Sequence, residues 1–186
     1  MQWFIPFLAI TLFTETYCHF LFENKKLTYI AYALYNPFAT LFYTYIFIQF
    51  AITKSLKKIF GVIIVLYLVF NVLYYIFLTK TIYWTFLIIL SGIIITLFAC
   101  LIIYQYLQVD DIDTIPNYSS KVWVISGLII FYTGVTIVIS LLKYIYENSL
   151  TINGEFLYNA IPRYLCIILY GCIAVSFFIW KNSSLK

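Results

Sequence analysis

Six long apolar stretches follow one another along the chain, and each one ends at charged or turn-forming residues. They cover residues 2–22, 28–52, 59–78, 82–107, 121–144 and 158–180. A helix needs about 20 apolar residues to cross the roughly 30 Å hydrocarbon layer of a bilayer. The apolar residues are continuous rather than alternating, which favours helices over membrane strands. The pattern therefore predicts an all-α, polytopic membrane bundle of six transmembrane helices.

The connections between these stretches are short, so residues 1–186 are expected to form a single membrane domain. The longest connections run from Leu107 to Ser120 and from Ile145 to Tyr158. The first stretch lacks the basic region of a cleavable signal peptide, and we expect it to be retained as a span. Ser126-Gly127 and Thr133-Gly134 in the fifth stretch predict a surface of small residues for close helix packing.

Composition supports a membrane protein and excludes several other classes. The chain is 65% hydrophobic and 10% charged, whereas soluble domains carry about 25% charged residues. The net charge of +4 comes from small clusters of lysines, which argues against binding to nucleic acid. Four cysteines without metal-ligand spacing and a single histidine predict no metal site, and we expect no cofactor.

The positions of the basic residues suggest an orientation. Lys54, Lys57 and Lys58 form the most compact basic cluster, between the second and third stretches. Because cytoplasmic loops carry an excess of basic residues, this cluster and both termini are expected on the cytoplasmic side. There the three lysines are candidates for contact with a cytoplasmic partner or with anionic lipid.

Glu15 and His19 are the strongest candidates for a functional site. They are four residues apart in the first stretch, so both side chains project from one face of a helix. An ionisable group at membrane depth is costly and usually has a partner or a water-filled cavity. We therefore consider Glu15 a candidate for ligand or proton binding, with pairing to His19 or Arg163 as the structural alternative.

Other polar residues are expected at a similar depth. In the predicted orientation Asn36, Asn71 and Arg163 lie in the outer half of the bundle, which suggests a polar pocket shared with Glu15 and His19. The alternative is structural, because asparagines also join membrane helices and a long arginine side chain reaches the headgroups. Pro37 removes a backbone hydrogen bond and is expected to kink the second helix.

The sequence carries none of the common enzymatic motifs. It has no nucleophile elbow, no P-loop and no paired intramembrane acids. The run Asp110-Asp111-Ile112-Asp113 lacks the glycine and the final glutamate of a calcium-binding EF-hand loop. We therefore expect no enzymatic activity.

Four segments carry a resemblance to known proteins: residues 7–15, Leu34-Tyr35-Asn36-Pro37-Phe38, residues 122–134 and residues 157–182. They resemble a group of small, uncharacterised multi-span membrane proteins common in Bacteroidota. The resemblance implies a six-helix bundle, or a seven-helix fold without its first helix, in a bacterial inner membrane. It also implies an association with histidine kinases. Glu15 and Asn36 match the group, whereas Phe42 stands where the group usually has an acidic residue.

Two functions from different classes fit the sequence. The first is a non-enzymatic sensory or signalling module, or a subunit of a membrane complex, with a partner such as a histidine kinase. The second is a small proton- or cation-coupled transporter or channel that uses Glu15 and the helix break at Pro37. A homo-oligomer is compatible with either function.

Overall fold

Long helices form the main part of the structure. The computed structural model describes residues 4–20, 25–77, 84–110, 115–152 and 154–183. The long helices are α1 (Phe4–Phe20), α2 (Lys25–Phe50), α3 (Lys54–Phe77), α4 (Trp84–Leu107), α5 (Tyr118–Ser140) and α7 (Leu157–Ser183). Each coincides with one predicted apolar stretch, so the all-α prediction is confirmed.

Four of these helices are long and apolar enough to cross a membrane. They comprise Lys54–Phe77, Thr85–Leu107, Tyr118–Ser140 and Leu157–Lys181. Helix α1 has 17 residues, or about 25 Å at 1.5 Å per residue, which is shorter than the hydrocarbon layer. Helix α2 has 26 residues, but its tyrosines and threonines, Asn36 and Pro37 make it less apolar. The chain is therefore a helical protein with several potential spans, and the count of six stays a prediction.

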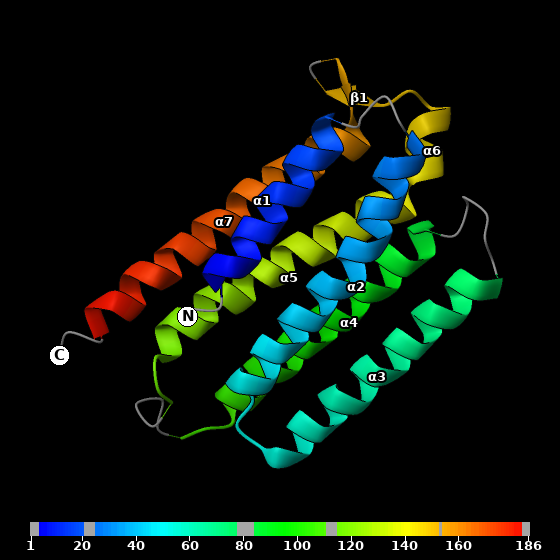
Figure 1. Ribbon diagram of the computed structural model, residues 1–186. Helices are drawn as coiled ribbons and strands as arrows, with labels where there is room; N and C mark the ends of the chain where they lie inside the picture. The colour runs from blue at the N-terminus through cyan, green and yellow to red at the C-terminus, as the bar shows by residue number, and fades with distance from the viewer. Residues whose placement is uncertain (1–3, 21–24, 78–83, 111–114, 153, 184–186) are drawn as a thin grey trace.

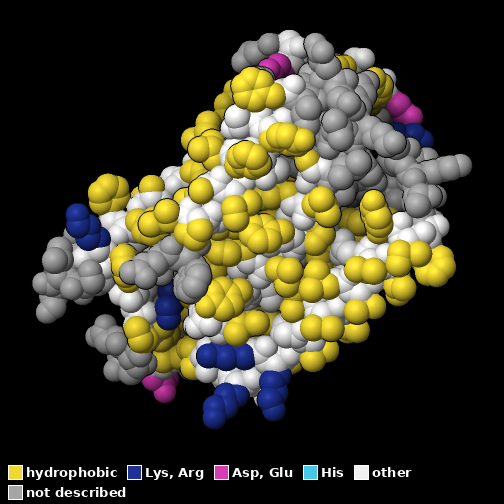
Figure 2. Space-filling model, in the orientation of Figure 1, with side chains coloured by type: hydrophobic (Ala, Val, Ile, Leu, Met, Phe, Trp, Pro, Cys, Tyr) yellow, Lys and Arg dark blue, Asp and Glu magenta, His cyan; other side chains and the backbone are white. Residues whose placement is uncertain are grey.

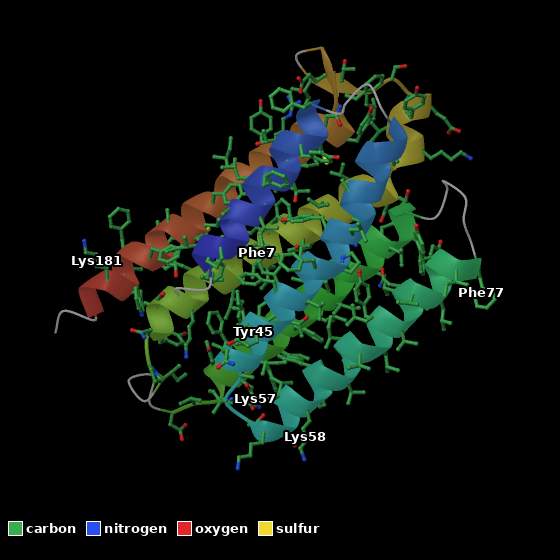
Figure 3. The ribbon with its side chains drawn as sticks, viewed as in Figure 1. Phe7, Tyr45, Lys57, Lys58, Phe77 and Lys181 are labelled. Atoms are coloured by element: carbon green, nitrogen blue, oxygen red, sulfur yellow. The ribbon has the colours of Figure 1, made fainter. Side chains whose placement is uncertain are left out.

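The long helices run side by side, with α3 at one edge and α7 at the opposite edge (Figure 1). Successive helices run in opposite directions. The start of α1, the α2–α3 turn, the end of α4 and the end of α7 therefore lie at one end of the bundle. We call this the basic end, because Lys57 and Lys58 project from it and Lys181 lies beside it (Figure 3).

Helices α4, α5 and α7 pack closely because small residues face their neighbours. A Cβ atom added at Gly127 would lie 2.8 Å from the Cβ of Cys172, and one at Gly134 would lie 2.5 Å from Leu165 Cδ1. The predicted small-residue surface of α5 is thus the face that contacts α7. Nearer the basic end, the fully buried Ser120 and Ser176 each donate to the other's backbone oxygen, at 3.0 and 2.8 Å.

The visible surface of the long helices is largely apolar, with lysines concentrated at the basic end (Figure 2). Seventeen large hydrophobic side chains of α1 and α3 are exposed, for example Phe13 (71%) and Phe77 (76%). Since a soluble protein rarely exposes large contiguous apolar areas, this surface suits contact with lipid.

The last connection contains structure that the sequence pattern did not predict. Helix α5 ends at Ser140, four residues before the predicted span end, and the short helix α6 (Leu142–Glu147) follows. Strands β1 (Thr151–Ile152) and β2 (Glu155–Phe156) then form an antiparallel hairpin. Gly154 has φ 81°, a conformation that glycine adopts without steric cost.

Candidate functional site

Glu15 lies in the second half of α1 and its side chain is exposed. The face of α1 that packs on the bundle carries Phe4, Phe7, Thr11 and Cys18, at the spacing of a helical stripe. Glu15 is four residues after Thr11 and three before Cys18, so it lies on the same helix face, where its side chain stays exposed. It is also the only acidic residue within the six long helices that the structure describes.

Two neighbouring helices lie near the Glu15 carboxyl group. The group interacts electrostatically with Tyr35 of α2 and with Cys166 and Tyr170 of α7. Helix α1 is fixed there by Thr11 Oγ1, which lies 2.8 Å from the hydroxyl of Tyr35. His19 follows on the same helix face, but its side chain lies outside the described residues. The Glu15 carboxyl group therefore lies on the side of α1 that is nearest to α2 and α7.

Asn36 takes part in a different set of contacts, which join three helices. Its Nδ2 donates to the hydroxyl of Tyr67 on α3 at 3.3 Å, and its Oδ1 accepts from Ser91 Oγ on α4 at 3.1 Å. Ser91 is fully buried and Tyr67 is 3% exposed. These groups are amide and hydroxyl groups without charge. They can hold helices together or bind a polar ligand. None of them is suited to act as an acid or a base near neutral pH.

Asn71 and the Pro37 region complete this polar layer. Asn71 Nδ2 donates to the Tyr67 carbonyl at 2.8 Å, one turn earlier on its own helix. Pro37 lies inside α2 and lacks an N–H group. Thr40, fully buried, donates its hydroxyl to the Asn36 carbonyl at 2.8 Å. We name Asn36, Thr40, Tyr67, Asn71 and Ser91 the polar layer.

Arg163 lies at the end of the structure opposite the basic end. Its Nη1 lies 2.8 and 2.7 Å from the two carboxylate oxygens of Glu155, which joins the start of α7 to strand β2. Both side chains are exposed, at 68% and 49%. The structure therefore brings Asn36 and Asn71 together around Tyr67. It places Glu15 toward α7 and Arg163 against the hairpin.

The basic end has its own ordered contacts. Gln105 of α4 accepts from the Ile52 N–H at 3.1 Å, and its Nε2 donates to Thr53 Oγ1 at 2.6 Å. Thr53 Oγ1 in turn accepts from the Leu56 N–H, which caps the first turn of α3. The α2–α3 turn that carries Lys54, Lys57 and Lys58 is thus attached to the end of α4.

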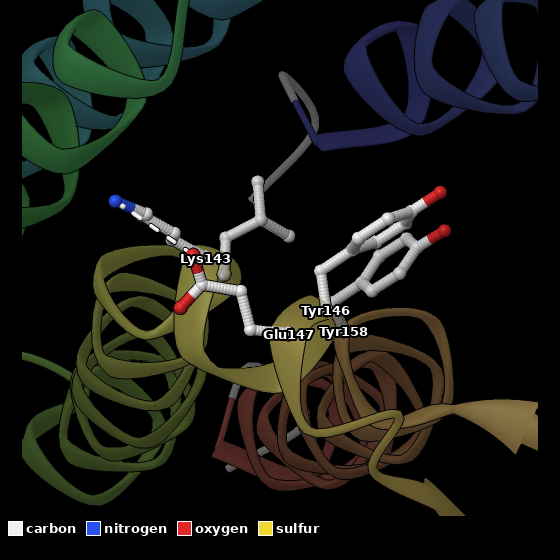
Figure 4. A pocket seen from close by; sticks show the side chains of 5 residues that line it. Lys143, Tyr146, Glu147 and Tyr158 are labelled. Atoms are coloured by element: carbon white, nitrogen blue, oxygen red, sulfur yellow. Dashed lines mark ion pairs between the residues drawn. The ribbon is translucent and has the colours of Figure 1, made fainter.

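A cavity of about 520 Å³ lies beside α6 (Figure 4). Lys143 and Glu147 line it and lie 3.7 Å apart, an exposed pair on one helix face. Tyr146 and Tyr158 also line it, and each ring stacks on Phe156 with 5.6 Å between centroids. None of the predicted site residues lines this cavity. Its aromatic and charged lining resembles the composition of a membrane interface.

Several partners in these sites were not singled out from the sequence. Among them are Tyr67, Ser91 and Glu155, which lie 31, 55 and 8 residues from the predicted residues that they contact. Ser91 precedes Gly92 in the middle of an apolar stretch. Such a pair of small residues indicates a contact between membrane helices, so the sequence did contain a signal for Ser91. The described residues contain no group of three or more His, Cys, Asp or Glu side chains suited to a metal ion.

Comparison with known proteins identifies no relative: no family model, no curated protein and no solved structure matches the chain.

Proposed function

We propose that this chain is a non-enzymatic, multi-span membrane protein that serves as a sensory or signalling module and joins a membrane partner through α1. The observation that carries the proposal is the exposed position of Glu15 on the mainly apolar helix α1. A carboxyl group at membrane depth costs a few kcal/mol. A polar or basic group on a helix of a partner, such as a histidine kinase, would add to the interactions that this carboxyl group already has with α2 and α7.

The other predicted residues have supporting roles in this proposal. Asn36 joins α2 to α3 and α4, Asn71 supports Tyr67 within α3, and Arg163 holds the hairpin. His19 serves with Glu15 at the partner-facing flank. Lys54, Lys57 and Lys58 lie at the cytoplasmic surface of a bacterial inner membrane, with six spans and both termini in the cytoplasm.

Co-purification from native membranes tests the proposal. The tagged full chain is expected to enrich a histidine kinase or another membrane signalling protein. Glu15→Gln removes the charge at constant size and is expected to abolish the enrichment. The control is Glu147→Gln, which changes an exposed acid of the Lys143 pair. Equal enrichment by wild type and Glu15→Gln, or no signalling protein with either, would contradict the proposal.

A proton- or cation-coupled transporter or channel is the second candidate, because α2 contains Pro37 next to the polar layer. Helix breaks at membrane depth line substrate paths in many transporters. Reconstitution of the purified chain into liposomes separates the two candidates. Proton or cation flux that disappears with Glu15→Gln would support transport, whereas the signalling proposal expects no flux.

A further inference from the structure

The outer face of α3 exposes apolar side chains near the basic end. Helix α3 packs against α2 and lies at the edge of the bundle (Figure 1). Val62, Val65 and Leu66 are exposed by 59%, 57% and 62%. Residues that are three, four and seven positions apart share one helix face, so these side chains form one stripe.

A groove of about 410 Å³ runs along this stripe. Lys58, Gly61, Val62, Val65 and Leu66 line it. The hollow comes from Gly61, where an added Cβ atom would meet nothing within 4 Å. From Lys58 to Leu66 the groove extends roughly 12 Å along the helix axis at 1.5 Å per residue. It is therefore a shallow, open apolar groove on the helix surface, with an ammonium group at one end.

Positive charge is concentrated at the mouth of the groove. Lys54 precedes Lys58 by four residues and so projects from the same face of α3. Both side chains are exposed. The two ion pairs found in the described part of the chain, Lys143–Glu147 and Arg163–Glu155, involve neither lysine. Like charges one turn apart repel each other, and an anion between them would relieve that repulsion.

We propose that the outer face of α3 is a binding site for one anionic phospholipid. Its phosphate lies at Lys54 and Lys58, and one acyl chain lies in the groove formed at Gly61 between Val62, Val65 and Leu66. The lysines at the mouth match the phosphate headgroup of such a lipid, and the apolar lining beyond them matches its acyl chain. Headgroup and acyl chain follow one another in the same order from the surface of a bilayer inward. This inference requires only that the basic end faces lipid headgroups, and it is independent of the role proposed for Glu15.

A second copy of the chain is a poorer occupant for this face. Two copies related by a two-fold axis along the membrane normal would place Lys58 opposite its own symmetry mate. The repulsion between these ammonium groups would oppose the contact. A lipid phosphate would instead be attracted by both lysines of a single chain.

Native mass spectrometry of the purified full chain tests the inference. The chain is released from detergent micelles that contain equimolar dioleoyl phosphatidylglycerol and dioleoyl phosphatidylcholine. We expect one phosphatidylglycerol to be retained preferentially. Gly61→Leu fills the groove and is expected to abolish this retention. Gly171→Leu is the control, because Gly171 is another helical glycine with nothing within 4 Å of an added Cβ.

The charge is tested separately. Lys58→Gln is expected to lower the preference for phosphatidylglycerol about five-fold, the effect of one lysine near a lipid surface. Lys143→Gln, on α6, is expected to leave the preference unchanged. Dihexanoyl phosphatidylglycerol and inorganic phosphate supply the charge without a long chain and are expected to bind weakly. Strong binding of either would overturn the role of the groove.

Two further results would overturn the inference. One is equal retention of phosphatidylglycerol by wild type and Gly61→Leu. The other is a wild-type dimer that becomes a monomer in Gly61→Leu without any change in lipid retention, which would assign the groove to a second copy.

Discussion

The contact between Asn36 and Tyr67 gives a quantitative test of the polar layer. Tyr67→Phe removes one hydroxyl group at a side chain that is 3% exposed and leaves the ring in place. The lost bond, from Asn36 Nδ2 to the Tyr67 hydroxyl, is 3.3 Å long. Good N–H···O bonds are about 2.9 to 3.0 Å. Since hydrogen bonds between membrane helices average about 0.6 kcal/mol and reach about 1.7 kcal/mol, we expect a loss near the average.

A double-mutant cycle isolates this contact from other effects of the substitutions. The free energy of unfolding is measured by detergent titration for wild type, Tyr67→Phe, Asn36→Ala and the double variant. We expect a coupling energy of roughly 0.5 kcal/mol between the two sites, as for residues in one hydrogen-bond network. Tyr164→Phe on the exposed surface of α7 is the control and should change little. A coupling energy of zero would refute the reasoning.

Three other perturbations test separate parts of the structure. Gly127→Ala brings a Cβ within 2.8 Å of its neighbour and should destabilise the α5–α7 contact by about 1 to 3 kcal/mol, whereas Gly171→Ala in open space should not destabilise. Gln105→Leu removes the acceptor of the Ile52 N–H and should accelerate hydrogen exchange at that amide, measured by mass spectrometry. Arg163→Gln breaks an exposed ion pair and should cost less than about 1 kcal/mol in thermal unfolding, with a smaller loss at high salt.

The sequence predicts the long helices well because their signal is simple. Continuous apolar residues between charged or turn-forming residues define where each helix begins and ends, as at Lys54 and Phe77 for α3. The same rule fails at Leu141-Leu142. Here α5 ends and α6 begins inside the predicted stretch 121–144, where near the break only Ser140 and Lys143 interrupt the apolar residues, so hydropathy gives little sign of the break.

The arrangement of the candidate site is harder to predict, for a physical reason. In a soluble helix the apolar stripe shows which face is buried. In a membrane helix the face toward lipid is also apolar, so the rotation of the helix leaves little trace in the sequence. The sequence therefore indicates that Glu15 and Asn36 are unusual. It does not indicate that Asn36 faces Ser91 on α4 while Glu15 faces α7.

Photo-crosslinking in intact native membranes tests the central claim most directly. A photoreactive amino acid replaces Leu12, which is 69% exposed and three residues before Glu15 on α1. A second variant carries it at Leu97 on α4, 55% exposed, as a control. We expect Leu12 to crosslink to a membrane signalling protein, Glu15→Gln to abolish that product, and Leu97 to crosslink to lipid. Lipid adducts alone at Leu12 would contradict the proposal that α1 joins this chain to a partner.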